Sequence, residues 1–220
     1  MTDELENKMA NNDVPSADCV LCRRLADFRV QNKHKYPDRH NAPVPAFGSR
    51  DARLLIVGLA PGLKGANFTG RPFTGDYAGQ ILYPALINAG LAAGNYAGHG
   101  GDGLELCDAR ITNAVRCVPP GNKPTTQEVR TCNAFLANEI VAMPALQHIL
   151  ALGRIAHDAV VIAHGERKAH YPFAHARHHE LPSGLMLTDS YHCSRYNVQT
   201  GRLTETMFSR VLHDIGMQLA

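Results

Sequence analysis

Short apolar runs alternate along the chain with longer mixed stretches, and this pattern predicts strands alternating with helices. The first strand is expected at residues 53–58, where an apolar run from Leu54 to Val57 ends in Gly58. Similar runs predict three more strands, at residues 110–115, 148–152 and 185–189. The stretches between and after the strands predict helices over residues 78–91, 126–143, 154–163 and 203–215.

Residues that favour helix ends support these boundaries. Thr125 or Thr126, with Glu128 close behind, is typical of a helix start, and Pro144 is expected to stop that helix. Gly90 and Gly216 are expected to end the first and last helices.

Helices that alternate with strands favour an α/β fold, with three layers in which helices cover both faces of a central parallel sheet. In such sheets ligands bind beyond the carboxyl ends of the strands, so the loops after strands one, two and four are the places to search. Residues 1–17 are polar and without periodicity, and we expect a disordered tail there, followed by one domain over residues 18–220. The Pro-rich, basic segment 33–49 is expected to be an ordered loop.

Composition narrows the classes of protein. A hydrophobic fraction of 45% with 19% charged residues is ordinary for a globular domain and excludes collagen-like, coiled-coil and wholly disordered chains. A net charge of +2 is too small to indicate nucleic-acid binding by bulk charge alone. We find neither a membrane span nor a secretory signal in the sequence, so a cytoplasmic location is expected.

Six cysteines in a reducing compartment are better interpreted as metal ligands or plain thiols than as disulfides. Cys19 and Cys22 form a C-x2-C pair, and Cys117 and Cys132 provide a second pair. Four thiolates can hold one zinc ion or one iron–sulfur cluster, and the spacing does not choose between them. The alternative is ordinary buried thiols, which is the interpretation we apply to Cys107.

The loop after the first strand, residues 58–76, is rich in Gly and Pro but matches neither a phosphate-binding P-loop nor a dinucleotide fingerprint. It ends with an aromatic residue, Phe73, and a carboxylate, Asp76, just before the next helix. Asp76 either caps that helix or serves a site.

Polar residues also follow the other strands. The amide of Asn113 can read the edge of a pyrimidine base, or it can pair with neighbouring backbone. His192, Ser194, Arg195, Tyr196 and Asn197 lie within six residues, and Arg195 and Tyr196 suit phosphate contact and base stacking.

We expect the linker before the last predicted strand to be solvated or to contact DNA rather than to bind metal. It contains five histidines. They are His164, His170, His175, His178 and His179.

These segments together resemble the uracil-DNA glycosylase superfamily, and most closely its family 5, the type-b enzymes. The resemblance spans residues 17–216. It is carried by Cys19-x2-Cys22, Gly58-Leu59-Ala60-Pro61-Gly62, Thr69-Gly70-Arg71-Pro72-Phe73-Thr74-Gly75-Asp76, Ile111-Thr112-Asn113-Ala114-Val115-Arg116-Cys117, His192 to Asn197 and Thr200-Gly201-Arg202-Leu203-Thr204. Family 4 has a glutamate at the position of Leu59, and the family's usual proline after His192 is Cys193 here.

The resemblance implies a four-stranded parallel sheet and a structural [4Fe–4S] cluster on Cys19, Cys22, Cys117 and Cys132. It also implies that the chain excises uracil and other deaminated bases, such as hypoxanthine and xanthine, from DNA. We expect it to act as a monomer. Because the superfamily's usual aspartate is absent from residues 58–62, Asp76 becomes the candidate carboxylate.

Roles follow for the other residues of the motifs. Phe73 would stack on the flipped base, in a pocket that includes Gly58, Leu59 and Ala60, and Asn113 would read the base edge. His192 would stabilise the departing base, while Asp76 would favour the cationic sugar or orient water, helped by Asn197. Ser194, Arg195 and Tyr196 would contact DNA.

Two rival functions stay open. A zinc-stabilised module that binds nucleic acid without catalysis would leave Asp76 and His192 without a joint role. A family 4-like enzyme strict for uracil is opposed by Leu59.

Overall fold

The four predicted strands pair in parallel at the centre of the computed structural model, which describes residues 13–219. They are β1 (Leu54–Gly58), β4 (Ala109–Asn113), β5 (His148–Leu152) and β7 (Met186–Ser190). A fifth strand, β6 (His178–Glu180), pairs antiparallel with β7, and the strand order is β4-β1-β5-β7-β6. The α/β class is confirmed, but the sheet has five strands rather than the expected four. The sequence did not predict β6 because it consists of three polar residues that are extended only through their pairing with β7.

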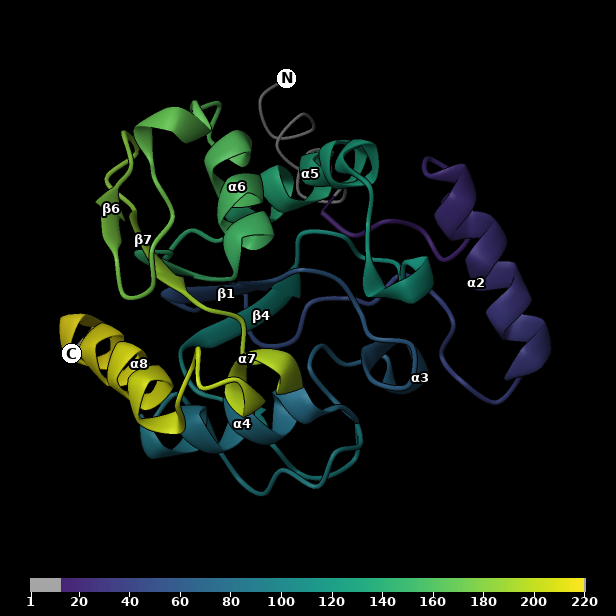
Figure 1. The fold of residues 1–220 in the computed structure, drawn as a ribbon, viewed down its shortest axis with the longest axis horizontal. Coiled ribbons are helices and arrows are strands. Elements are labelled where there is room, and N and C mark those ends of the chain that lie inside the picture. The colour runs from purple at the N-terminus through teal and green to yellow at the C-terminus, as the bar shows by residue number, and fades with distance from the viewer. Residues whose placement is uncertain (1–12, 220) are drawn as a thin grey trace.

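Helices cover both faces of this sheet (Figure 1). On one face lie α4 (Tyr77–Asn88) and α8 (Glu205–Leu219), and on the other α5 (Thr126–Val141) and α6 (Arg154–Ala163). Side chains of β1 alternate between the two cores: Leu54 and Ile56 pack toward α4 and α8, Leu55 and Val57 toward α5 and α6. All four are fully buried, so β1 is apolar throughout, as a strand covered on both faces must be.

One predicted helix end is confirmed by the structure and another is wrong. At the start of α5, Thr125 and Glu128 form a reciprocal capping box, as the sequence predicts. At the end of α8, however, Gly216 lies inside the helix, which continues to Leu219. The expected stop at Gly216 is wrong because the buried face that includes Leu212 and Ile215 continues to Leu219.

Helix α2 (Arg23–Lys35) was not predicted, and it includes the first residues of the expected loop 33–49. Its buried residues lie at helical spacing, but two of them, Arg29 and Asn32, are polar and hide the apolar period. Arg29 is buried because it donates hydrogen bonds to the oxygen of Cys19 and to the sulfur of Cys117. The helix therefore packs through apolar contacts of Leu25 as well as the polar contacts of Arg29 beside the cysteines.

The remaining elements are short. They are α3 (Ala66–Thr69), the pair β2 (Ala92–Ala93) and β3 (Glu105–Leu106), the 3-10 turns Pro120–Asn122 and Lys168–His170, and α7 (Arg195–Gln199). Within the expected tail, residues 1–12 lie outside the described residues. Asp13 is buried and pairs with Arg50 at 2.7 Å, so order begins before residue 18. Of the helices in the described part of the chain, none is both long and apolar enough to cross a bilayer.

Candidate active site

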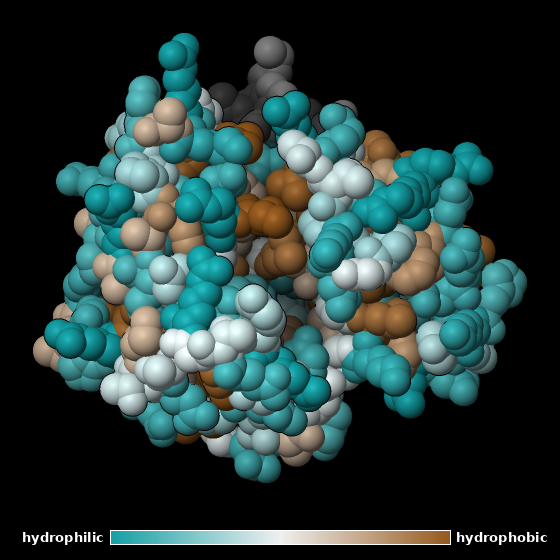
Figure 2. Space-filling view, viewed as in Figure 1, coloured by the Kyte–Doolittle hydropathy of each residue, from teal (hydrophilic) through white to brown (hydrophobic). Residues whose placement is uncertain are grey.

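A cavity of about 570 Å³ opens beyond the carboxyl ends of β1, β4, β5 and β7, where the fold class predicts a binding site. Figure 2 shows this face of the molecule, hollowed near its centre, with apolar side chains in the hollow and polar ones around it. The cavity wall includes most of the residues that the sequence singled out: Leu59, Ala60, Phe73, Asp76, Asn113, His192, Ser194 and Arg195. Gly58, Tyr196 and Asn197 are not on the wall.

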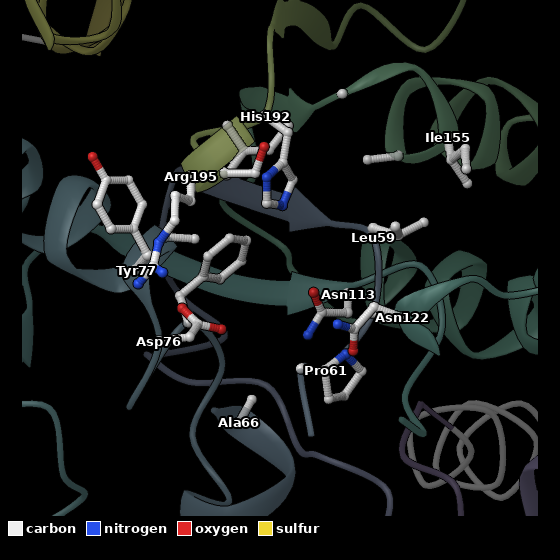
Figure 3. A pocket seen from close by; sticks show the side chains of 18 of the residues that line it. Leu59, Pro61, Ala66, Asp76, Tyr77, Asn113, Asn122, Ile155, His192 and Arg195 are labelled. Atoms are coloured by element: carbon white, nitrogen blue, oxygen red, sulfur yellow. The ribbon is translucent and has the colours of Figure 1, made fainter. Parts of the chain in front are cut away.

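Gly58 lies behind the wall and determines how closely two side chains approach β1. A Cβ atom at this position would lie 2.5 Å from the ring of Phe73 and 2.5 Å from Oδ1 of Asn113. Any side chain there would push both groups out of place. Asn113 is itself buried at the end of β4, and among the described residues its amide has no hydrogen-bond partner. It is therefore available to a ligand in the cavity (Figure 3).

Phe73 is held in a left-handed conformation, with φ of +52°, which a large side chain adopts only when its surroundings enforce it. Two tyrosines fix the backbone on either side of its ring. The hydroxyl of Tyr83 donates to the oxygen of Pro72 at 2.6 Å, and that of Tyr96 donates to the oxygen of Phe73 at 3.2 Å. The ring is stacked near His192, with 5.8 Å between the ring centroids.

A buried ion pair between Arg71 and Asp102 stabilises the same loop. The guanidinium of Arg71 donates twice to the carboxylate of Asp102, at 2.8 and 2.7 Å, and its Nε donates to Thr74 at 2.8 Å. The hydrogen bonds from Arg71 hold the pKa of Asp102 well below its usual range. Both side chains of the pair are almost fully buried, so the loop that carries Phe73 is preorganised by the protein alone.

Asp76 caps α4, because its Oδ1 accepts the N–H of Gly79 at 3.1 Å. Its Oδ2 faces the glycine loop, where a Cβ atom at Gly65 would come within 2.5 Å of it. Burial raises the pKa of Asp76, and the N–H groups of Gly79 and Ala78 oppose that rise. The carboxylate of Asp76 therefore both caps α4 and lines the cavity.

His192 reaches the cavity from the segment after β7 (Figure 3). Desolvation lowers the pKa of His192 to about 4, so the imidazole is neutral at physiological pH. A neutral imidazole acts on a developing anion by donating a hydrogen bond rather than by carrying a full charge.

The residues after His192 divide between the cavity and the surface. Ser194 caps α7, and the guanidinium of Arg195 lies 5.3 Å from the ring centroid of Tyr77 at the cavity wall. Tyr196 is 71% exposed, which suits contact with a large partner. Asn197 instead donates its amide to the backbone oxygen of His192 at 2.8 Å, so it stabilises the backbone of the segment that carries His192.

Asn122 is a cavity residue that the sequence reading missed. It ends the 3-10 turn Pro120–Asn122 with φ of +56°, and its exposed side chain reaches the cavity wall near Asn113 and Pro61 (Figure 3). The Pro-Pro-Gly-Asn sequence indicates a turn, but only the fold brings this turn over the ends of β1 and β4.

The four predicted cysteine ligands surround a second, closed cavity of about 20 Å³. Cys22 precedes α2, Cys117 follows β4 and Cys132 lies on α5, so segments far apart in sequence meet here. Two N–H groups point at the sulfurs: Arg29 donates to Cys117 at 3.5 Å, and the backbone of Arg116 donates to Cys132 at 3.4 Å. Burial raises the pKa of Cys22 to about 11 and that of Cys117 to about 12, and the Arg29 guanidinium opposes the rise at Cys117.

A zinc ion and an iron–sulfur cluster require different spacings of the four sulfurs at this cavity. Tetrahedral zinc with Zn–S bonds of about 2.3 Å needs sulfurs about 3.8 Å apart. Among the described residues, no three of these sulfurs lie within 4.8 Å of one another. N–H groups directed at thiolate sulfurs are also a usual feature of iron–sulfur sites.

The two other cysteines have different surroundings. Cys107 is exposed, so the expected core thiol is wrong: it lies just after β3 on a surface hairpin. Cys193 is fully buried, and its thiol donates to the oxygen of Ala78 in the first turn of α4 at 3.6 Å. This contact ties the His192 segment to the helix that Asp76 caps.

Comparison with known proteins gives one consistent family. The model of the uracil DNA glycosylase superfamily matches residues 45–216. A type-5 uracil-DNA glycosylase of Thermus thermophilus is 47% identical, over 88% of this chain and 90% of its own length. Enzymes of the same description from Mycobacterium leprae (41% identical, 89% of each chain) and Pyrobaculum aerophilum (37%, over 96% of this chain and 90% of its own) also match.

Proposed function

The chain belongs to the uracil DNA glycosylase superfamily, and on that premise we propose that it hydrolyses the N-glycosidic bond of uracil and other deaminated bases in DNA, the first step of base excision repair. One observation carries the proposal: Phe73, Asp76, Asn113 and His192 meet around a single cavity. A nucleic-acid-binding module without catalysis has no need to bring Asp76 and His192 to the same wall.

The substrate base must leave the duplex to reach this cavity. Phe73 offers it a stacking surface, and the free amide of Asn113 pairs with its edge. Leu59 adds an apolar wall where a family 4-like enzyme has a glutamate. A cavity that recognises bases mainly by stacking accepts hypoxanthine and xanthine as well as uracil.

Cleavage of the bond leaves negative charge on the base and positive charge on the sugar. The neutral imidazole of His192 donates a hydrogen bond to the departing base. The carboxylate of Asp76 stabilises the cationic sugar and orients the attacking water. We add Asn122 as a second group for that water, because its amide lies on the same wall. Asn197, first expected at the reaction centre, acts as a positioning residue for His192.

DNA is held outside the cavity. Arg195 and the exposed ring of Tyr196 grip the backbone next to the flipped nucleotide, or fill the gap that it leaves, and Ser194 contributes at the rim. The whole cavity belongs to one chain, so a monomer suffices. Thiols that must stay reduced suit the cytoplasm.

Cys19, Cys22, Cys117 and Cys132 would hold a [4Fe–4S] cluster. When bound, the cluster supplies structure rather than redox chemistry: it joins the segment before α2 to β4 and α5.

The test is release of free base from duplexes that contain one uracil, hypoxanthine or xanthine, under single-turnover conditions at one salt concentration. The proposal predicts release of all three bases. DNA binding without release would favour the binding module, and release of uracil alone would favour a family 4-like enzyme.

A further inference from the structure

Three titratable side chains from three elements meet where α6 packs beside β6 and β7, outside the cavity. His157 lies on α6, His179 on β6 and Asp189 on β7, and their ligand atoms all lie within 4.8 Å of one another. The side chains of His157 and Asp189 are fully buried, and that of His179 is 9% exposed. None of the three is used by the reaction proposed above.

The carboxylate of Asp189 presents one oxygen to each histidine. Its Oδ1 lies 2.6 Å from Nδ1 of His157, and its Oδ2 lies 3.4 Å from Nε2 of His179. The N–H of Ala174 donates to Oδ2 at 3.3 Å and fixes the direction of the carboxylate. Two imidazole nitrogens and the two oxygens of one carboxylate therefore converge, and imidazole and carboxylate are both ligand types that zinc takes in proteins.

His157 has the second contact that metal-bound histidines usually have. Its Nε2 lies 2.7 Å from the backbone oxygen of Tyr171. A carbonyl can only accept, so Nε2 carries a proton and Nδ1 is the atom turned toward Asp189. A hydrogen bond of this kind fixes the tautomer and the ring orientation of a histidine ligand.

His179 lacks a well-directed hydrogen bond. Its Nε2 is buried and lies 3.4 Å from Oδ2 of Asp189, but no well-formed hydrogen bond to it is found among the described residues. Leaving a buried polar atom unpaired costs free energy, and such atoms are rare. The rings of Tyr171 and His157 flank this imidazole, at 5.7 and 5.5 Å between centroids, and shield it from solvent.

We propose that His157, His179 and Asp189 form a structural Zn²⁺ site, separate from the four cysteines. The ion takes Nδ1 of His157, Nε2 of His179 and both oxygens of Asp189, and the proton between His157 and Asp189 leaves to solvent. Such a site would fasten the short edge strand β6 to β7 and α6. Because the first residues of α6 form part of the cavity wall, the site also steadies that wall.

The experiment measures zinc and iron together in the cluster-containing protein. Wild type, His179→Gln and His170→Gln are incubated with Zn²⁺, passed over a chelating resin and analysed by plasma mass spectrometry. Gln at position 179 keeps a polar group beside Asp189, so the fold is preserved. His170 is an exposed residue of the same linker and serves as the control for surface binding.

We expect wild type and His170→Gln to retain one zinc per chain more than His179→Gln, with equal iron in all three. Zinc should also raise the melting temperature of wild type by about 5 °C or more, and leave that of His179→Gln unchanged. Equal zinc in wild type and His179→Gln, or none in wild type, would overturn the site and leave a proton-bridged His157–Asp189 pair.

Discussion

The cavity at the strand ends and the cysteine cavity are both assembled from distant segments, but they differ in what holds them together. The cavity at the strand ends is held by protein contacts alone: Arg71 is paired with Asp102, and tyrosine hydroxyls hold the backbone around Phe73. At the other cavity, four thiols face one another across a small space, and burial raises the pKa of Cys22, Cys117 and Cys132. The first site is preorganised by the protein, whereas the second is the one that we propose to be completed by a metal cluster.

The largest effect should come from removing a cysteine of the second cavity. Cys117→Ser should abolish iron binding and lower the free energy of unfolding by about 3 kcal/mol or more, because binding energy at such a site is folding energy. Iron and sulfide analysis with chemical denaturation measures both. Cys107→Ser is the control, since Cys107 is exposed on a hairpin and should leave both quantities unchanged. Equal iron content in Cys117→Ser and Cys107→Ser would contradict the assignment of the cluster to this cavity.

Breaking the buried ion pair tests whether the first cavity is held by the protein itself. Asp102→Asn leaves Arg71 buried beside a neutral partner, and the free energy of unfolding should fall by about 3 kcal/mol. Iron content should not change. Asp108→Asn is the matched control, because its pair with Arg53 is partly exposed, and the loss there should be about 1 kcal/mol or less. Loss of iron in Asp102→Asn would mean that the two cavities are not independent.

Asp76→Asn separates capping from chemistry. The amide keeps most of the cap on α4, so stability should fall by about 1 kcal/mol at most. If the charge serves the reaction, uracil release should slow by about 100-fold or more, equivalent to about 2.7 kcal/mol, while DNA binding persists. Single-turnover kinetics on a uracil-containing duplex measures this loss. A near-normal rate would leave Asp76 as a helix cap only.

Asn113 and Phe73 should differ in how they depend on the base. Asn113→Ala should reduce uracil release by about 10-fold and hypoxanthine release by less, because the purine presents another edge and a larger stacking face. Phe73→Ala should slow both. The comparison needs both substrates at one salt concentration. Equal fractional losses in Asn113→Ala would show that this amide positions water or backbone instead.

The smallest expected effect is a shift in the acid limb of the pH–rate profile, the range in which the rate of base release falls as the pH is lowered. Burial raises the pKa of Asp76 above its usual 3.8, so the carboxylate is fully charged only well above that pH, and the rate falls as the pH drops through the raised pKa. The pKa of His192 is lowered to about 4, so its imidazole is neutral at pH values well above 4. In Asp76→Asn the limb should move down toward pH 4. A limb near pH 6.5 that Asp76→Asn does not move would indicate a charged His192.

Local sequence was sufficient for the parts of this protein that depend on near neighbours. The apolar run at 54–57 predicts a buried strand, and Thr125 with Glu128 predicts a capping box, because each depends on residues a few positions apart. The strand-end rule then placed Asp76, Asn113 and His192 on one side of the sheet, where they line a common cavity.

Only the tertiary structure decided the rest. Arg29 and Asn32 make α2 look polar, and the benefit of burying Arg29 comes from Cys117, far along the chain. The strand β6 exists because β7 offers it a partner. Asn122 reaches the cavity because its turn lies at the ends of the strands, and Asn197 on α7 contacts the backbone of His192. Contacts between segments distant in sequence leave no periodic trace in either segment, because their free energy is gained only once the chain has folded.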